Sequence, residues 1–240
     1  MDNLKLFEPP HPIHRVGKHN DGGYVICKLP GEYDLFISGG VSDDISFEQH
    51  LLNIYPNLKC YAFDGTVNSL PANDQRVTFI KKNLGKYDSL ETTNLKSYMD
   101  GFNNIFMKID IEGHEFRLFP ELEDYMPKIK QLVLEVHSPG DIKLHPNYFK
   151  GLGDIDHPFM LNMIAMINKT HTLVHVHANN GCERHTYDSI LLPNVFECTF
   201  VRNDFVTEKI PNKTPLPLSI DMKNIKDKPD YYINYYPFVN

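Results

Sequence analysis

Ionisable side chains cluster in the stretch MKIDIEGHE, residues 107–115, at the end of an apolar run. The run has the length and composition of a buried strand. The cluster after it comprises Asp110, Glu112, His114 and Glu115. One interpretation is local, with Asp110 capping a following helix and the other charges forming its solvated first turn. The other is chemical, because such groups can move protons or bind a cation.

A second pair of ionisable residues, Glu135 and His137, ends another apolar run at residues 130–137. They stand two positions apart, so in a strand their side chains point to the same face. Either could remove a proton from a reacting hydroxyl. With Asp110 they could instead bind a divalent metal such as magnesium or manganese, which would acidify a bound hydroxyl. An ion-paired strand end without chemistry is the plainer alternative.

Strands and helices alternate along most of the chain. Strands are expected at residues 34–40, 58–64, 77–85, 105–111, 130–137, 171–180 and 194–204, and helices at 44–56, 92–102, 114–126 and 158–168. This alternation predicts a mostly parallel α/β sheet with right-handed crossovers. The last two strands have no helical pattern between them, so we expect an antiparallel strand at the sheet edge.

The predicted architecture is a single Rossmann-like domain over residues 1–240, with seven strands and helices on both faces of the sheet. Residues 1–30 are expected to form an N-terminal arm with a short strand. Residues from about 207 to 240 are rich in proline and tyrosine and lack periodicity. We expect them to lie over the domain as an irregular arm.

Composition limits the classes of partner. The net charge of -7 and the lack of a basic run argue against a nucleic-acid partner. No apolar run is long enough to cross a membrane, and the acidic start of the chain does not resemble a signal peptide. The four cysteines have no metal-like spacing and suit a reduced, cytoplasmic protein. The sequence is compatible with a monomer or a homodimer.

Glycines and polar residues also end the other predicted strands, where open parallel sheets bind their ligands. The candidates for binding a cofactor are Ser38, Gly39, Gly40, Asp64, Gly65 and Asn83, together with Asp110. An acid at the end of the second strand can accept the hydroxyls of a ribose. The acids Asp43 and Asp44 would repel a pyrophosphate at the first loop. A cationic adenosine such as S-adenosylmethionine tolerates them. Plain turns are the alternative for the glycines and for Asp64.

Seven segments together resemble the FkbM-type, or methyltransferase-21-like, family of class I S-adenosylmethionine-dependent methyltransferases. They are DGGYV (21–25), FISGGVSDDISFE (36–48), CYAFD (60–64), KKNLG (81–85), MKIDIEGHE (107–115), QLVLEVH (131–137) and HVHANN (175–180). The resemblance runs from about Arg15 to Asp204, and the D-x-E-G sequence from Asp110 to Gly113 is its most specific element. It implies a seven-stranded sheet with the last strand antiparallel. It also implies O-methylation, often of a sugar or small metabolite.

The resulting hypothesis is an O-methyltransferase for a sugar, a glycan or a small-molecule hydroxyl. Asp110 would lie between methyl donor and acceptor, with His137 and Glu135 as the base or, with Asp110, as ligands of a metal. His177, Asn179 and Asn180 could bind acceptor hydroxyls, although a polar face on an edge strand is as plain an explanation. In the family picture, Asp21 and Tyr24 lie near the mouth of the site. The alternatives are an NAD-dependent oxidoreductase of sugar metabolism and an inactive binding module with a methyltransferase fold.

Overall fold

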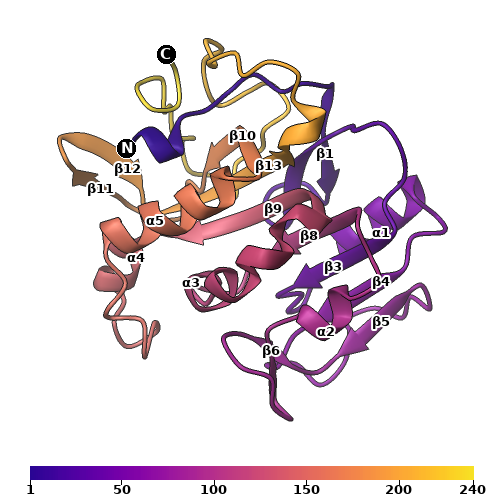
Figure 1. The fold of residues 1–240 in the computed structure, drawn as a ribbon. Helices are drawn as coiled ribbons and strands as arrows, with labels where there is room; N and C mark the ends of the chain where they lie inside the picture. The colour runs from indigo at the N-terminus through magenta and orange to yellow at the C-terminus, as the bar shows by residue number, and fades with distance from the viewer.

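The computed structural model describes all residues from Met1 to Asn240 and contains one large seven-stranded sheet (Figure 1). From one edge to the other, the strands run in the order β10 (His171–Ala178), β13 (Val195–Arg202), β9 (Ile129–His137), β8 (Ile105–Ile109), β3 (Leu35–Gly39), β4 (Cys60–Phe63) and β5 (Val77–Ile80). All seven predicted strands are therefore present. The protein is a mixed α/β fold built on a mostly parallel sheet.

The antiparallel strand is β13, and it lies one position inside the edge that β10 forms. The prediction of an antiparallel edge strand was therefore wrong in its placement, although the last two strands do pair with each other. No helix joins β10 to β13. A small hairpin of β11 (Arg184–Tyr187) and β12 (Ile190–Pro193) reverses the chain, and β13 then returns between β10 and β9. In this register Glu197 lies opposite both Glu135 and His177.

One face of the sheet is covered by α2 (Lys96–Met99), α3 (Glu115–Leu118), the 3-10 helix η2 (Phe119–Lys128) and α5 (His157–Asn168). Their apolar side chains share the main core with sheet residues such as Ile37 and Met107. The predicted helix at 114–126 is divided here, and Pro120 stands at the start of its 3-10 half. A proline lacks the N–H that a continuing α-helix would use, which explains the division.

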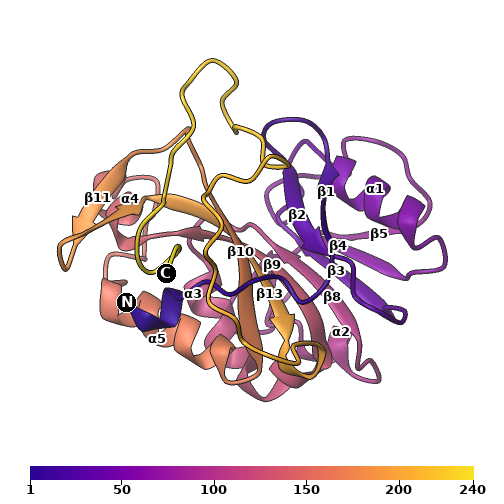
Figure 2. The ribbon, with the colours of Figure 1, turned by 90° about the horizontal axis from the view of Figure 1, so that it is seen from above.

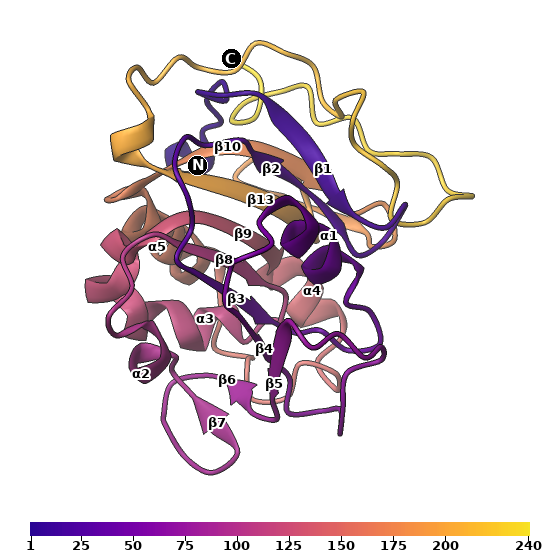
Figure 3. The same ribbon diagram turned by 90° about the vertical axis from the view of Figure 1, so that its right-hand side faces the viewer.

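The opposite face carries a single α-helix, α1 (Ser46–Ile54), beside a hairpin of β1 (Ile13–Gly17) and β2 (Gly23–Cys27) (Figure 3). Phe47 of α1 packs on Phe36 and Phe106 of the sheet. Helices therefore lie on both faces, but the hairpin provides much of the cover on this one. The N-terminal segment, expected to hold one short strand, holds this pair of strands.

The two ends of the chain lie side by side over the β10 edge of the sheet (Figure 2). A 3-10 turn, η1 (Asp2–Leu4), starts the chain, and the Leu6 N–H donates to the Pro237 carbonyl. The last regular element is the 3-10 turn η3 (Asn203–Phe205), and residues 206–240 contain no helix or strand.

Three short elements complete the fold. They are α4 (Pro139–Leu144), which follows β9, and the two-residue strands β6 (Asn83–Leu84) and β7 (Thr92–Thr93), which pair in parallel. None of the helices combines the length and the apolar character needed to cross a bilayer.

Candidate active site

A cavity of about 900 Å³ opens at the carboxyl ends of β3, β4 and β8 and is flanked by β6. Of the predicted cofactor-binding residues, those that line it are Gly40, Asp64, Gly65, Asn83 and Asp110. Ser38 does not line it. Its hydroxyl is fully buried and donates to Glu48 of α1. Its side chain is therefore not available to a ligand in the cavity.

Gly40 allows the first loop to lie directly against the end of β8. Its φ of +77° lies in the left-handed region that favours glycine, and an added Cβ would come within 1.6 Å of the Asp110 carbonyl oxygen. The Lys108 ammonium also donates to the Gly40 carbonyl at 2.9 Å. The glycine thus holds the loop close to Asp110, with room for a ligand above it.

Asp64 directly follows β4, and its carboxylate organises the neighbouring loops. One oxygen accepts from the Ser42 N–H at 2.9 Å, and the other accepts from the N–H and hydroxyl of Thr66 at 2.7 and 2.6 Å. Burial raises the pKa of Asp64, but the hydrogen bonds from Thr66 and Ser42 outweigh burial and leave it below its usual range. The carboxylate is therefore ionised and already positioned by the loops that donate to it.

Asp110, Glu135 and His137 converge as the sequence predicts. Each offers one ligand atom, and these atoms all lie within 4.8 Å of one another. Asp110 follows β8, and the other two end the adjacent strand β9. The Glu135 and His137 side chains are over nine-tenths buried, whereas the Asp110 side chain is 24% exposed and reaches the cavity. Asp110 therefore connects a buried polar centre to the open space.

The His137 ring is oriented by Asp141, a residue that the sequence analysis did not single out. His137 Nδ1 lies 2.9 Å from Asp141 Oδ2, and both side chains are buried. Nε2 faces Glu112 at 3.3 Å and Glu135 at 3.5 Å without a well-aligned hydrogen bond. The His137 main-chain N–H donates to Glu115 Oε1 at 3.0 Å. The ring thus presents Nε2 to the acidic side of the site.

The protonation of the cluster follows from burial and from charge. Burial and the negative charge of Asp110 raise the pKa of Glu135 to about 8. Burial lowers the pKa of His137, but the hydrogen bond to Asp141 and the nearby carboxyl of Glu135 outweigh it and raise the pKa well above its usual range. For Asp110, burial is outweighed by the positive charge of Lys108, so its pKa is lowered. The raised pKa values of Glu135 and His137 favour their protonated forms, and the lowered pKa of Asp110 favours its ionised form.

Two more predicted residues contact the cluster. The Tyr24 hydroxyl, on β2, donates to Asp110 Oδ2 at 2.7 Å. The Asn179 amide, just after β10, donates to Glu135 Oε1 at 3.2 Å. Both contacts fix the carboxyl groups that they reach. Tyr24 and Asn179 were predicted to bind the acceptor, but in the structure their polar groups are used to hold Asp110 and Glu135.

The other residues proposed to bind the acceptor lie away from the cavity. His177 is buried between Glu197 and Asp230, and these carboxylates outweigh burial and raise its pKa to about 10. Asn180 uses its side chain to hold the C-terminal arm, donating to the Ile225 carbonyl at 2.9 Å. Asp21 is exposed and accepts from Asn224 of the same arm at 3.3 Å. These three side chains join the arm to the sheet.

The donor set suits a divalent ion. Two carboxylates supply the oxygen ligands that magnesium and manganese prefer, and the imidazole adds a nitrogen ligand of the kind that zinc and iron also bind. Nε2 of His137 is buried and without a hydrogen bond, while Nδ1 is held by a carboxylate, the arrangement common to metal-binding histidines. Asp110, Glu135 and His137 would be its ligands.

The cavity wall beyond Asp110 was not predicted. It is formed by Glu112, His114, Arg117, Tyr148 and Phe149. Glu112 belongs to the D-x-E-G sequence and was visible as a candidate. Tyr148 and Phe149 lie in a segment after α4 that has no periodicity or strand-end position, so nothing in the sequence marked them.

A family model described as "Methyltransferase FkbM domain" matches residues 10–165, more than half of the 240-residue chain. The protein therefore belongs to the FkbM methyltransferase family, as the resemblance indicated.

Two solved structures of one enzyme show a weaker likeness. The first is the plantazolicin methyltransferase BpumL in complex with a monoazolic desmethylPZN analog and SAH, with a TM-score of 0.42 and 8% identity over 72% of this chain and 76% of that one. The second is the same enzyme in complex with SAH, with a TM-score of 0.39 and 8% identity over 72% and 77% of the two chains. None of the curated proteins matches the sequence.

Proposed function

We propose that the protein transfers a methyl group from S-adenosylmethionine to a hydroxyl of a sugar, a glycan or a small molecule. The observation that carries this proposal is the cavity itself, which places the ionised Asp64 on one side of Asp110 and the Glu135–His137 pair behind it. Family membership supports methyl transfer in general. The acidic, proton-holding centre supports an oxygen acceptor in particular.

The cofactor is proposed to lie between the first loop and β6. Its ribose would contact Asp64, and its adenine would lie near Asn83 and Leu84. The sulfonium would lie near Asp110, where an ionised carboxylate stabilises positive charge. Neither ammonium near the first loop is free for an NAD pyrophosphate, because Lys18 is paired with Asp44 at 3.2 Å and Lys108 donates to the Gly40 carbonyl.

In the reaction, the acceptor oxygen attacks the methyl carbon in line with the sulfur, the carbon–sulfur bond breaks and S-adenosylhomocysteine leaves. The hydroxyl proton must be removed. His137 is proposed as the base that accepts it once its own proton has left, and Asp141 would then stabilise the imidazolium that forms. A divalent ion bound by Asp110, Glu135 and His137 would lower the pKa of the hydroxyl instead.

The experiment is to incubate the protein with S-adenosylmethionine and a panel of hydroxyl and amine acceptors, with and without a divalent ion, and to measure S-adenosylhomocysteine and methylated product. We expect methyl ethers of at least one hydroxyl acceptor. Asp110→Asn should reduce turnover far more than it changes the melting temperature. Methylation of amines alone would reject the oxygen acceptor. A variant that melts much lower and keeps its specific activity would make Asp110 a structural residue.

A further inference from the structure

Glu112 has a backbone conformation that few residues other than glycine adopt. Its φ is +56°, and the following Gly113 has a φ of +83°. An added Cβ at Gly113 would lie 2.7 Å from Leu152, so the turn after β8 is also tightly packed. Such conformations destabilise a fold and concentrate where a side chain must be held in a particular direction. The turn directs Glu112 to the cavity, where the side chain is 52% exposed.

Glu112 also contacts the catalytic histidine proposed above. Its Oε2 lies 3.3 Å from His137 Nε2, the buried nitrogen that makes no well-aligned hydrogen bond. Burial of Glu112, opposed by the charge of His137, leaves the carboxyl pKa raised. Among the carboxyls around this histidine, Glu112 is the one most open to the cavity. A molecule entering there would meet Glu112, with the buried His137 ring directly behind it.

An aromatic surface stands beside Glu112. Tyr148 lines the same cavity, and its residue is 65% exposed. Its ring packs edge-to-face on Phe149 with centroids 5.0 Å apart, and Phe149 in turn lies 5.4 Å from the His137 ring. Burial and the negative charge of Glu112 raise the pKa of Tyr148.

We infer that Glu112 and Tyr148 form the acceptor subsite, and that the ligand is a saturated ring carrying neighbouring hydroxyls, as in a sugar. A carboxylate accepts hydrogen bonds from hydroxyls, and the negative face of a tyrosine ring attracts the C–H edge of a saturated ring. The subsite lines the same cavity as Asp64 and Asp110. This inference rests on the proposed function, since it places the methylated hydroxyl next to His137.

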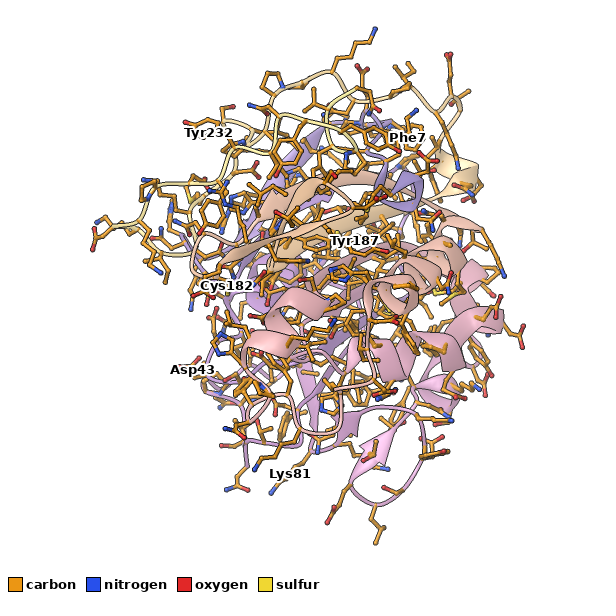
Figure 4. The ribbon with its side chains drawn as sticks, turned by 90° about the vertical axis from the view of Figure 1, so that its left-hand side faces the viewer. Phe7, Asp43, Lys81, Cys182, Tyr187 and Tyr232 are labelled. Atoms are coloured by element: carbon orange, nitrogen blue, oxygen red, sulfur yellow. The ribbon has the colours of Figure 1, made fainter.

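The protein has no tryptophan, so Tyr148→Trp introduces a single fluorescent reporter in the subsite. Methyl glycosides of common hexoses are the probes, catechol is the planar comparison, and titrations are run with and without S-adenosylhomocysteine. Tyr232→Trp is the matched control, because Tyr232 is 69% exposed on the C-terminal arm and does not line the cavity. Figure 4 shows it at the opposite end of the molecule from Lys81, whose neighbour Lys82 lines the cavity. We expect a saturable change in emission with at least one glycoside for Tyr148→Trp only.

Adding Glu112→Gln to Tyr148→Trp should weaken glycoside binding at least about tenfold, with binding of S-adenosylhomocysteine unchanged. A response to catechol alone, a response at Tyr232→Trp alone, or equal affinity with Glu112→Gln would overturn the inference. No response to any glycoside would overturn it too. Glycoside binding without any binding of S-adenosylhomocysteine would reject the proposed function and leave the subsite standing.

A second readout separates the subsite from a structural ion pair with His137. Asn adopts positive φ more readily than Glu, so Glu112→Asn should raise the melting temperature by about 2–4 °C while it weakens glycoside binding. Glu112→Gln keeps the strained backbone and should not raise it. A lower melting temperature for both variants, with unchanged glycoside binding, would make Glu112 a structural residue.

Discussion

His137 Nδ1 lies 2.9 Å from Asp141 Oδ2, and this contact sets the direction of the imidazole ring. Asp141 is in the first turn of α4, but its carboxylate makes no capping hydrogen bond to that helix. It is directed at His137 instead. Because Nδ1 is held, Nε2 is the atom that faces Glu112, Glu135 and the acidic centre.

Asp141→Asn should lower the pKa of His137, because the variant loses the carboxylate whose hydrogen bond raises it. Turnover, or affinity for a divalent ion, should fall by about 10–100-fold, the usual effect of losing a residue that orients a functional histidine. NMR titration of the His137 ring reports the pKa without needing an acceptor.

Asp204→Asn is the matched control for Asp141→Asn. Asp204 is also an acid in the first turn of a short helix, the 3-10 turn η3, but it pairs with Arg202, the last residue of β13. It should leave the His137 signals and turnover unchanged. An unaltered His137 titration in Asp141→Asn would show that Asp141 does not orient the ring.

Binding of manganese should release protons. Glu135, with a pKa of about 8, and His137, with a raised pKa, must both deprotonate before they can bind an ion. Affinity should therefore rise with pH, and calorimetric heats should depend on the ionisation enthalpy of the buffer. If Asp110, Glu135 and His137 hold a metal in the reaction, EDTA should abolish activity and His137→Ala should abolish binding of the ion. Activity that survives EDTA and rises with pH towards the raised pKa of His137 would favour a metal-free base.

Asp64→Ala should weaken binding of S-adenosylhomocysteine by roughly 1.5–3 kcal/mol, through loss of charge-assisted hydrogen bonds to the ribose. Asp64 also holds the Ser42 and Thr66 loops, so loop disorder must be separated from ligand contact. Thr66→Val removes the hydroxyl bond to Asp64 and leaves the carboxylate in place. If both variants lose affinity equally, Asp64 acts by ordering the loop.

Glu115→Gln should flatten the dependence of stability on pH. Burial raises the pKa of Glu115 to about 7, above the 4.5 expected in the unfolded chain. The folded state therefore binds the proton more tightly, so stability is fully present below pH 4.5 and falls as pH rises through about 7. The loss amounts to at most about 3 kcal/mol.

Urea unfolding of wild type and Glu115→Gln at pH 5 and pH 8 tests this, since the variant has no carboxyl to titrate. The other titrating groups are common to both proteins, so the difference isolates Glu115. A constant difference in the free energy of unfolding at both pH values would show that Glu115 is not buried in its neutral form.

The strands were predictable because their signals are local. Runs such as 105–111 and 130–137 are apolar throughout, as strands buried on both faces must be, and β8 and β9 are indeed buried along their whole length. The position of β13 between β9 and β10 is a long-range choice that no local pattern encodes. The hairpin β11–β12 was missed, and only one strand of the β1–β2 pair was expected, because strands of four or five residues give a weak periodic signal.

The site was predictable wherever a residue ends a strand. Asp110, Glu135 and His137 were found from that position alone, and the structure brings them together. Asp141 was not found, because its importance depends on how α4 packs on β9. Conversely, Asn180 ends a strand like the others, yet its amide holds the C-terminal arm. Position at a strand end identifies candidates, but tertiary packing decides their partners.

Calorimetric titration with S-adenosylhomocysteine and, separately, with NAD tests the central claim most directly. The protein is proposed to bind an adenosine ligand without a pyrophosphate in the cavity beside Asp64 and Asp110. We predict saturable binding of S-adenosylhomocysteine at one site per chain, weakened by Asp64→Ala, and no heat of binding with NAD. Binding of NAD without binding of S-adenosylhomocysteine would contradict the claim and indicate an oxidoreductase.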